Sequence, residues 1–337
     1  MTPEEKLMEN PYNEINDYFE NTLPKTGKKI SRYASLINPS LIIPKIKYKG
    51  RDIRTTISVM VLGPSGSGKT TFLELMKYFA YNSFEFQHIT SAKIARELSE
   101  ARQMTLIVND MARVMKDQKV IKVIEGVIEE GKFVHTTMTS EYKSETDASL
   151  FGVSVPSDIS SHISSGLLFR VIPVIVKHDL DEQKHVGKDI TRHVGNELKE
   201  SEITLKDIKD FYDKLRIIQA GKNVDNLPVS EFDITEEHRN ILYSEWSGVL
   251  DKLEIDETTL WFRELLDGFR FLHCIAFLNY FNRKKERKDD RTCVLIPNNE
   301  DLDIAKKLMI EEILVKHDIV NLWEIKKKLA KVKKIGQ

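Results

Sequence analysis

The segment 63–70 constrains the fold more than any other part of this sequence. Its residues, GPSGSGKT, match the pattern GxxxxGK[ST] at every specified position. A nearly unbroken apolar run at 56–62 precedes it, as in a parallel strand that is covered on both faces. Residues 70–79 follow with apolar side chains at the spacing of one helical face. The sequence therefore predicts a glycine-rich turn between a buried strand and a helix, which is the context that the pattern requires.

A turn of this kind suits a polyphosphate. Successive backbone N–H groups and the positive end of the helix dipole bind phosphate oxygens. We expect Lys69 to reach the β and γ phosphates and the Thr70 hydroxyl to ligate magnesium, so the predicted cofactors are ATP and Mg²⁺. The alternative is a glycine turn that precedes Lys-Thr by chance. The predicted cofactor-binding residues are Gly63, Pro64, Ser65, Gly66, Ser67, Gly68, Lys69, Thr70 and Thr71.

Strand-forming and helix-forming segments alternate after residue 56. The alternation predicts an α/β fold of the P-loop NTPase type, with a parallel five-stranded sheet between helices. Pro173 cannot donate a hydrogen bond to a neighbouring strand, so we expect its strand at the edge of the sheet. The expected strands are 56–62, 84–89, 105–108, 150–155 and 171–177; the expected helices are 70–79, 91–102 with Ser91 as N-cap, and 111–130; a hairpin is expected at 132–143.

The punctuation of the chain suggests three parts. Residues 1–52 contain several prolines among short mixed stretches, which indicates an irregular arm or small subdomain more than a packed unit. Residues 53–227 hold the expected ATPase core. Residues 228–337 look mostly helical, most clearly at 258–282, and suggest an α-helical lid with a basic C-terminal tail.

The composition narrows the setting. Hydrophobic residues make up 41% and charged residues 31% of the 337 residues. No apolar run approaches the roughly 20 residues that a membrane span needs. The first residues lack the order of a signal peptide, and Cys274 and Cys293 form no CxxC pair. We expect a cytoplasmic protein with no membrane partner, no disulfide framework and no structural zinc.

An acidic residue is expected near the phosphate-binding turn, since nucleotide hydrolysis needs a carboxylate in the magnesium shell and often a second one to orient water. The apolar strand 105–108 ends in Asn109-Asp110, which allows two registers. In one, Asp110 is the magnesium carboxylate and Met111 occupies the position of the base. In the other, Asn109 replaces the magnesium carboxylate and Asp110 is the base. Either way one usual acid is missing, and Asp110 could instead only cap the following helix.

The order of these elements resembles that of AAA+ ATPases, and most closely that of minichromosome-maintenance and superfamily 3 helicases. In those families the magnesium-site strand is followed by a helix, a channel hairpin, a sensor strand and a Leu-Leu-Ser-Arg-Phe motif. The matching segments here are Asn109-Asp110, Glu130-Gly131-Lys132, 150–156 and 166–170. Arg263, Arg270 and residues 273–276 are similar to the arginines and Ala-His-Ala-like stretch of the family's lid.

The resemblance implies roles for two arginines. Arg170 would be an arginine finger that enters the nucleotide site of the adjacent subunit and stabilises the transferring phosphoryl group. Arg263 would contact the γ phosphate from the lid. Both could instead be surface arginines of little energetic weight. The family's sensor strand has an Asn-Pro pair where this sequence has Val155-Pro156, which leaves Ser154 as the candidate polar sensor.

DNA contacts would have to be local, because the 51 basic and 52 acidic residues nearly cancel. If the hairpin lines a channel, Lys132 and Lys143 would touch DNA phosphates, which provide affinity without sequence information. Ordinary exposed lysines are the alternative. The same holds for the basic cluster near residue 337, where most such runs are simply solvated.

These features lead to two hypotheses of function. The first is an ATPase that forms a homo-oligomeric ring, with a hexamer as the expected size, and translocates on or unwinds DNA. The second is an ATP-gated assembly, DNA-packaging or partition protein with slow or no hydrolysis, motivated by the missing acid. A small-molecule kinase fits less well. Such kinases usually have a phosphate-clamping arginine lid shortly after the core, and the long helical C-terminal part does not have this pattern.

Overall fold

The computed structural model describes residues 1–23, 26–48, 51–136, 141–155, 165–177, 203–255 and 262–335. Within these ranges only the backbone is described for residues 48, 51, 132–136, 141–144, 165–166 and 322–335.

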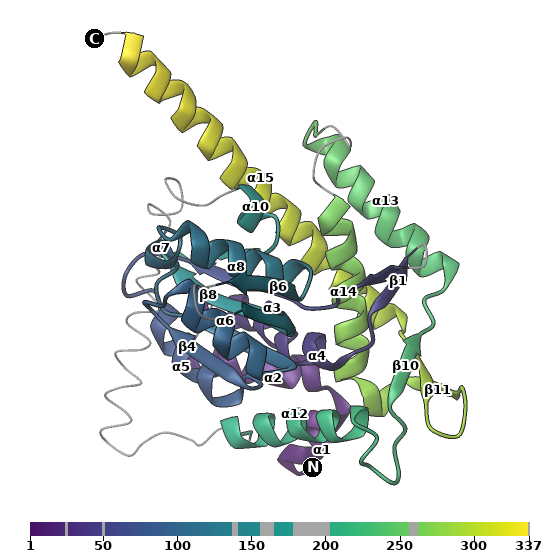
Figure 1. Ribbon diagram of the computed structural model, residues 1–337. Helices are drawn as coiled ribbons and strands as arrows, with labels where there is room; N and C mark the ends of the chain where they lie inside the picture. Colours follow the sequence, from purple (N-terminus) through teal and green to yellow (C-terminus); the bar gives the residue numbers. More distant parts are fainter. Residues whose placement is uncertain are drawn as a thin grey trace, which may run out of the picture.

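A five-stranded, all-parallel sheet forms the centre of the molecule (Figure 1). The sheet confirms the predicted α/β class. Four of its strands are almost entirely buried because helices cover both faces, and only the edge strand β4 is mostly exposed. The spatial order is β4 (Ser83–Phe86), β5 (Gln103–Val108), β8 (Asp147–Ser154), β3 (Val59–Leu62) and β9 (Ile172–Ile175).

The edge position of β9 confirms the expectation from Pro173. The backbone N–H of Ile172 donates to Ser58 O at 2.8 Å, and that of Val176 donates to Leu62 O at 2.7 Å. Pro173 follows Ile172, so its nitrogen faces the open edge, where no ladder bond is lost.

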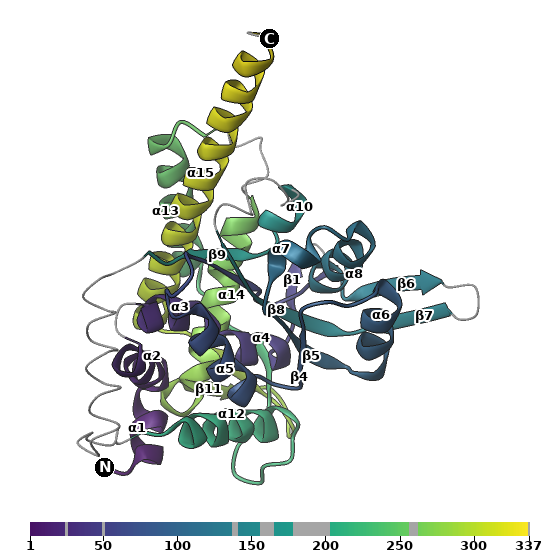
Figure 2. The same cartoon turned by 90° about the vertical axis from the view of Figure 1, so that its left-hand side faces the viewer.

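Alternate residues of the strands face two hydrophobic clusters. Val61 and Phe151 belong to the cluster under α5 (Lys69–Phe79), α12 (Leu205–Gln219) and the N-terminal helices. Leu62 and Leu150 belong to the cluster under α6 (Ser91–Glu100), α7 (Met111–Val114), α8 (Gln118–Glu129) and α10 (Ser165–Leu168). Figure 2 shows α3 and α5 on one side of the sheet and α6 and α8 on the other.

Two local expectations are wrong. The helix expected at 111–130 is two helices, because the Asp117 side chain accepts hydrogen bonds from the backbone N–H groups of Lys119 and Val120 and starts α8. The N-cap of α6 is Thr90, whose hydroxyl accepts from Lys93 N at 3.3 Å, so Ser91 is the first residue inside the helix.

The N-terminal segment is helical and packed, which corrects the expectation of an irregular arm. Pro11 and Pro39 lie in first turns, where a helix loses no hydrogen bond to proline. Phe19 is fully buried, with its ring centroid 4.8 Å from that of Phe72 in α5. The elements are α1 (Pro3–Glu9), α2 (Pro11–Thr22), α3 (Thr26–Ala34), α4 (Ile37–Ile42), β1 (Ile46–Tyr48) and β2 (Arg51–Ile53).

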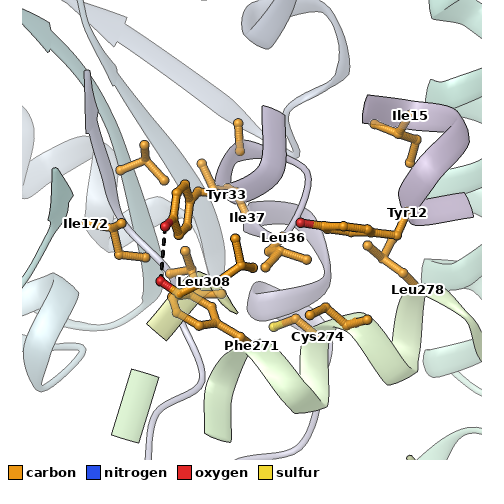
Figure 3. Close-up of a cluster of buried hydrophobic side chains, with 14 of the residues drawn as sticks. Tyr12, Ile15, Tyr33, Leu36, Ile37, Ile172, Phe271, Cys274, Leu278 and Leu308 are labelled. Atoms are coloured by element: carbon orange, nitrogen blue, oxygen red, sulfur yellow. Dashed lines mark hydrogen bonds between the residues drawn. The ribbon is translucent and has the colours of Figure 1, made fainter. Parts of the chain in front are cut away.

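The C-terminal part is mostly helical, as predicted, with an unpredicted small sheet of order β10-β12-β11. Tyr33 of α3 donates a hydrogen bond to Leu308 O at 3.1 Å, beside Phe271 (Figure 3). These contacts join segments from all three expected parts in one hydrophobic cluster. The domain limits at 52 and 227 stay predictions. The elements are β10 (Val229–Phe232), α13 (Glu236–Lys252), α14 (Phe262–Leu278), a short 3₁₀ turn (Tyr280–Asn282), β11 (Lys284–Arg287), β12 (Cys293–Ile296) and α15 (Asn299–Ile335).

A buried ionic cluster joins α14 to α15. Lys316 lies 2.8 Å from a carboxylate oxygen of Glu264 and 2.6 Å from one of Glu312, and all three side chains are fully buried. Removing one member of such a cluster leaves an uncompensated buried charge, at a cost of about 3–5 kcal/mol. The cluster therefore fixes the base of α15, whose far end extends beyond the other elements in both views (Figures 1 and 2).

The hairpin expected at 132–143 is confirmed as an antiparallel pair, β6 (Lys132–Thr136) and β7 (Glu141–Glu145). Figure 2 shows the pair extending beyond α6 and α8. Over the described ranges, no helix has the length and apolar character needed to cross a bilayer.

Candidate functional site

The turn at 63–70 joins β3 to α5, as predicted. Gly66 and Gly68 have φ angles of 78° and 79°, a region that side chains disfavour and glycine enters freely. Gly68 is the N-cap of α5, and because glycine has no side chain, it does not cap the first N–H groups of the helix. The first N–H groups of α5 therefore belong to a helix terminus of the kind that binds anions.

Gly63 is wedged between the neighbouring strands. Its N–H donates to Ser154 O of β8 at 3.1 Å. A Cβ at this position would lie 2.3 Å from Val176 Cγ2 and 2.7 Å from Ser67 Oγ. The turn thus leaves the sheet at a point where only glycine fits.

Lys69 closes the turn from inside. Its ammonium group donates to Gly63 O at 2.6 Å, Pro64 O at 2.5 Å and Ser67 Oγ at 3.3 Å, which accounts for all three of its N–H donors. Burial lowers the pKa of Lys69. The side chain is buried, whereas Thr70 and Thr71 are exposed at the start of α5. A bound phosphate would exchange with the carbonyl partners of Lys69.

Asn109 and Asp110 lie on the same side of the sheet as the turn, where the parallel strands have their carboxyl ends. We call this side the carboxyl edge and the opposite side the amino edge. Val108 pairs with Gly152, and Gly152 pairs with Met60. Asp110 therefore lies level with Leu62, with one strand between them, a separation of about 10 Å at 4.8 Å per strand.

Asp110 caps α7, as the capping alternative expected. Its Oδ1 accepts from Arg113 N at 3.3 Å, and its Oδ2 lies 3.1 Å from Arg113 Nε. Asn109 Nδ2 donates to a carboxylate oxygen of Glu85 in β4. A magnesium-ligating role for Asp110 stays a prediction. The donor chemistry fits, because Mg²⁺ is held by one or two carboxylates together with phosphate oxygens.

Ser154 is a buried hydroxyl at this edge. It is the last residue of β8, the strand between the turn and Asp110, and it is 5% exposed. Its Oγ has no hydrogen-bond partner among the described atoms. A buried polar group without a partner is costly, and such groups are rare in folded proteins. The candidate sensor position therefore holds an unused donor and acceptor close to the turn.

Arg170 and Arg263 lie together, and away from the turn. Both donate to the carboxylate of Glu129, the last residue of α8: Arg170 to one oxygen and Arg263 to the other. Arg170 comes two residues before β9, whose first residue pairs with Val59 at the amino end of β3. The cluster is therefore about 20 Å from the turn, the length of six residues in an extended strand.

Two parts of the predicted site are thus separated within one chain. Lys69, Thr70, Asp110 and Ser154 lie at the carboxyl edge of the sheet, and the two arginines lie at the amino edge. In this conformation Arg263 does not reach the turn of its own chain. For Lys132 and Lys143 the structure describes only the backbone, and Pro156 lies outside the described residues.

Sequence reasoning missed Glu129 and Arg54. Arg54 Nη1 donates to Val127 O and Thr146 O, both at 3.1 Å, and its Nη2 lies 2.6 Å from Asp147 Oδ1. Its guanidinium occupies the space where a Cβ on Gly131 would be, and Gly131 has a φ of 60°. No motif marks either residue, because their partners lie far away in the chain.

No model of a known protein family matches this sequence, and no curated protein is significantly similar to it. Within the part of the chain that the structure describes, no three His, Cys, Asp or Glu side chains gather as metal ligands.

Proposed function

We propose that this chain binds ATP with Mg²⁺ at residues 63–70 and hydrolyses it as an AAA+-like ATPase that assembles into a ring and acts on DNA. The observation that supports this most is the buried Lys69 inside a glycine-rich turn. The turn lies where a central parallel strand meets a helix N-terminus, at the carboxyl edge where such sheets bind ligands.

Residues 65–70, Asp110 and Ser154 have separate roles in nucleotide binding and hydrolysis. The N–H groups of residues 65–70 cradle the β phosphate, and Lys69 leaves its carbonyl partners to neutralise the β and γ phosphates. The Thr70 hydroxyl and Asp110 would hold Mg²⁺, which supplies charge neutralisation on the transferring group. The buried Ser154 Oγ supports a role in orienting the attacking water or a γ-phosphate oxygen.

A ring supplies what one chain lacks. Arg170 and Arg263 are about 20 Å from the turn of their own chain, which is the length of six residues in an extended strand. They are half-buried, with side-chain exposures of 21% and 31%, so a neighbouring subunit can reach them. In a head-to-tail assembly, of which a hexamer is our expected size, the arginines of one subunit meet the phosphates of the next.

The hairpin β6–β7 is the part of the chain that would contact DNA. The hairpin β6–β7 extends from the body, and the sequence carries Lys132 and Lys143 on its two strands. In a ring, several such hairpins would gather positive charge that the nearly neutral chain does not have as a whole.

Calorimetry with ATP and Mg²⁺, followed by turnover measurements with single-stranded and duplex DNA, tests the proposal. We expect ATP uptake at one site per chain, formation of an assembly, and faster turnover with DNA. An absence of ATP uptake would sink the proposal as a whole. Uptake by a chain that remains a monomer would remove the ring and the arginine role.

A second candidate function is an ATP-gated assembly or DNA-packaging or partition protein with slow hydrolysis. It is favoured by the contacts of Asp110, whose two oxygens are already engaged by Arg113, and by the buried Met111 that follows. ATP that is bound but not hydrolysed, with an ATP-dependent change in assembly mass, would favour this function.

A further inference from the structure

Glu129 joins the two arginines of the cluster. Arg170 uses Nε and Nη2 for one carboxylate oxygen, and Arg263 uses Nη2 for the other. A guanidinium has five N–H donors, so each arginine retains donors that do not point at Glu129. A single carboxylate therefore holds two forks beside each other without consuming them.

The backbone around the cluster is firmly anchored. Arg170 follows Leu167 and Leu168, which are fully buried, and its own N–H donates to Leu167 O at 2.9 Å. Arg263 precedes Glu264, which is tied to the buried Lys316 at 2.8 Å. The backbone positions of both arginines are therefore tied to buried groups, and Glu129 contacts both of their side chains.

Glu129 itself has a rigid mount. Two residues later, Gly131 N donates to Gly126 O at 3.1 Å and Val127 O at 3.0 Å, which closes the C-terminus of α8. Arg54 packs against Gly131 and donates to Val127 O. The carboxylate thus sits at a fixed point between the core and the base of the hairpin.

Charge makes this arrangement necessary for two adjacent arginines. Two guanidinium groups a few Å apart repel each other, and at a partly exposed site the repulsion is on the order of 1–4 kcal/mol. One carboxylate between them attracts both groups and offsets that repulsion, and it leaves a net charge of about +1 on the unit. The unit still attracts an anion and keeps two sets of N–H donors for it.

We propose that Glu129 is a positioning residue that aligns Arg170 and Arg263 as one paired cation for the γ phosphate on the neighbouring subunit. This inference rests on the proposed function and adds a third residue to it. Glu129 does not touch the nucleotide; it acts through the two arginines.

The test compares Glu129→Ala and Glu129→Asp with the matched control Glu130→Ala, in the full-length assembly. Misplacing catalytic groups by about 1 Å costs up to the order of 100-fold in rate. We expect Glu129→Ala to lower kcat by about 10- to 100-fold while the Kd for ATP stays unchanged. Glu129→Asp should recover part of the rate, and Glu130→Ala, an exposed carboxylate one residue away, should match the wild type.

A mixing experiment separates positioning from a folding defect. Lys69→Ala subunits retain the arginine pair, and Glu129→Ala subunits retain the turn. In an equal mixture about a quarter of the interfaces combine both intact halves, so turnover should rise well above that of either variant alone. No recovery, or wild-type kcat in Glu129→Ala, would overturn the inference.

The outcome for Arg170→Ala tells the two ideas apart. If Arg170→Ala and Glu129→Ala both hydrolyse ATP at the wild-type rate, the trans arginine of the proposed function fails. If Arg170→Ala is inactive and Glu129→Ala is normal, only the positioning role of Glu129 fails.

Discussion

The two edges of the central sheet are built in different ways. At the carboxyl edge, the turn at 63–70 is held mainly by backbone groups and by Lys69, which is buried within its own loop. At the amino edge, Glu129, Arg170 and Arg263 come from three distant segments and meet through side chains alone. The first arrangement is local and is visible in a short stretch of sequence. The second exists only after the chain has folded.

The largest expected effect tests the carboxyl edge. Lys69→Ala removes the only ammonium inside the turn, and we expect the loss of measurable ATP binding and turnover. Isothermal titration with ATP and Mg²⁺ checks the binding. Lys93→Ala, an exposed lysine of α6, is the control and should bind normally. Normal ATP affinity in Lys69→Ala would mean that the turn is only structural.

The second effect tests the amino edge. Arg170→Ala should leave ATP binding intact and lower kcat by about 10³-fold, the lower end of the range for an arginine finger. Steady-state turnover and the Kd for ATP, measured on the same assembly, give the two values. The surface residue Arg96 on α6, replaced with Ala, provides the comparison. Equal loss of binding and turnover would place Arg170 in a structural role instead.

The contrast between the edges also marks the reach of the sequence. Residues 56–79 could be predicted because strand, turn and helix are contiguous, and Pro173 placed β9 at the sheet edge by a local rule. Glu129 could not, because its partners are 41 and 134 residues away in the chain. The sequence does not predict the N-terminal helices, because Pro11 and Pro39 suggest breaks, although proline in the first turn is compatible with a helix.

A third prediction concerns the pH dependence of stability on the side of the molecule that carries Arg263. His273 lies in α14, which also carries Arg263; it is stacked on Phe232, and burial lowers its pKa to about 3. The unfolded chain binds this proton near pH 6.5, so stability is lost as the pH falls below that value. We expect a loss of about 2 kcal/mol between pH 8 and pH 5 from this residue.

Denaturant unfolding at several pH values measures that loss. The side chain of His273→Phe cannot take up a proton, so the free energy of unfolding of this variant should fall by about 2 kcal/mol less between pH 8 and pH 5. An unchanged slope in His273→Phe would show that other groups carry the acid sensitivity.

The smallest expected effect concerns the turn geometry. Gly68 has a φ of 79°, and its Cβ would meet Thr26 at an ordinary 3.5 Å, so Gly68→Ala is opposed by conformation and not by a clash. We expect a loss of about 1 kcal/mol in stability. Gly248→Ala in α13, where a Cβ meets nothing within 4 Å, should change stability in the opposite direction, by about 0.5–1 kcal/mol. Thermal unfolding of the two variants measures both changes in stability.

The length of α15 gives small motions at its base a large effect. The helix has 37 residues, about 55 Å at 1.5 Å per residue. Its first half is clamped through Lys316, so the last twenty residues form a stiff lever of about 30 Å. A tilt of about 10° at the pivot sweeps its tip through about 5 Å, one full helical pitch. A sub-ångström rearrangement of α14 would thus be amplified severalfold at the far end of the molecule.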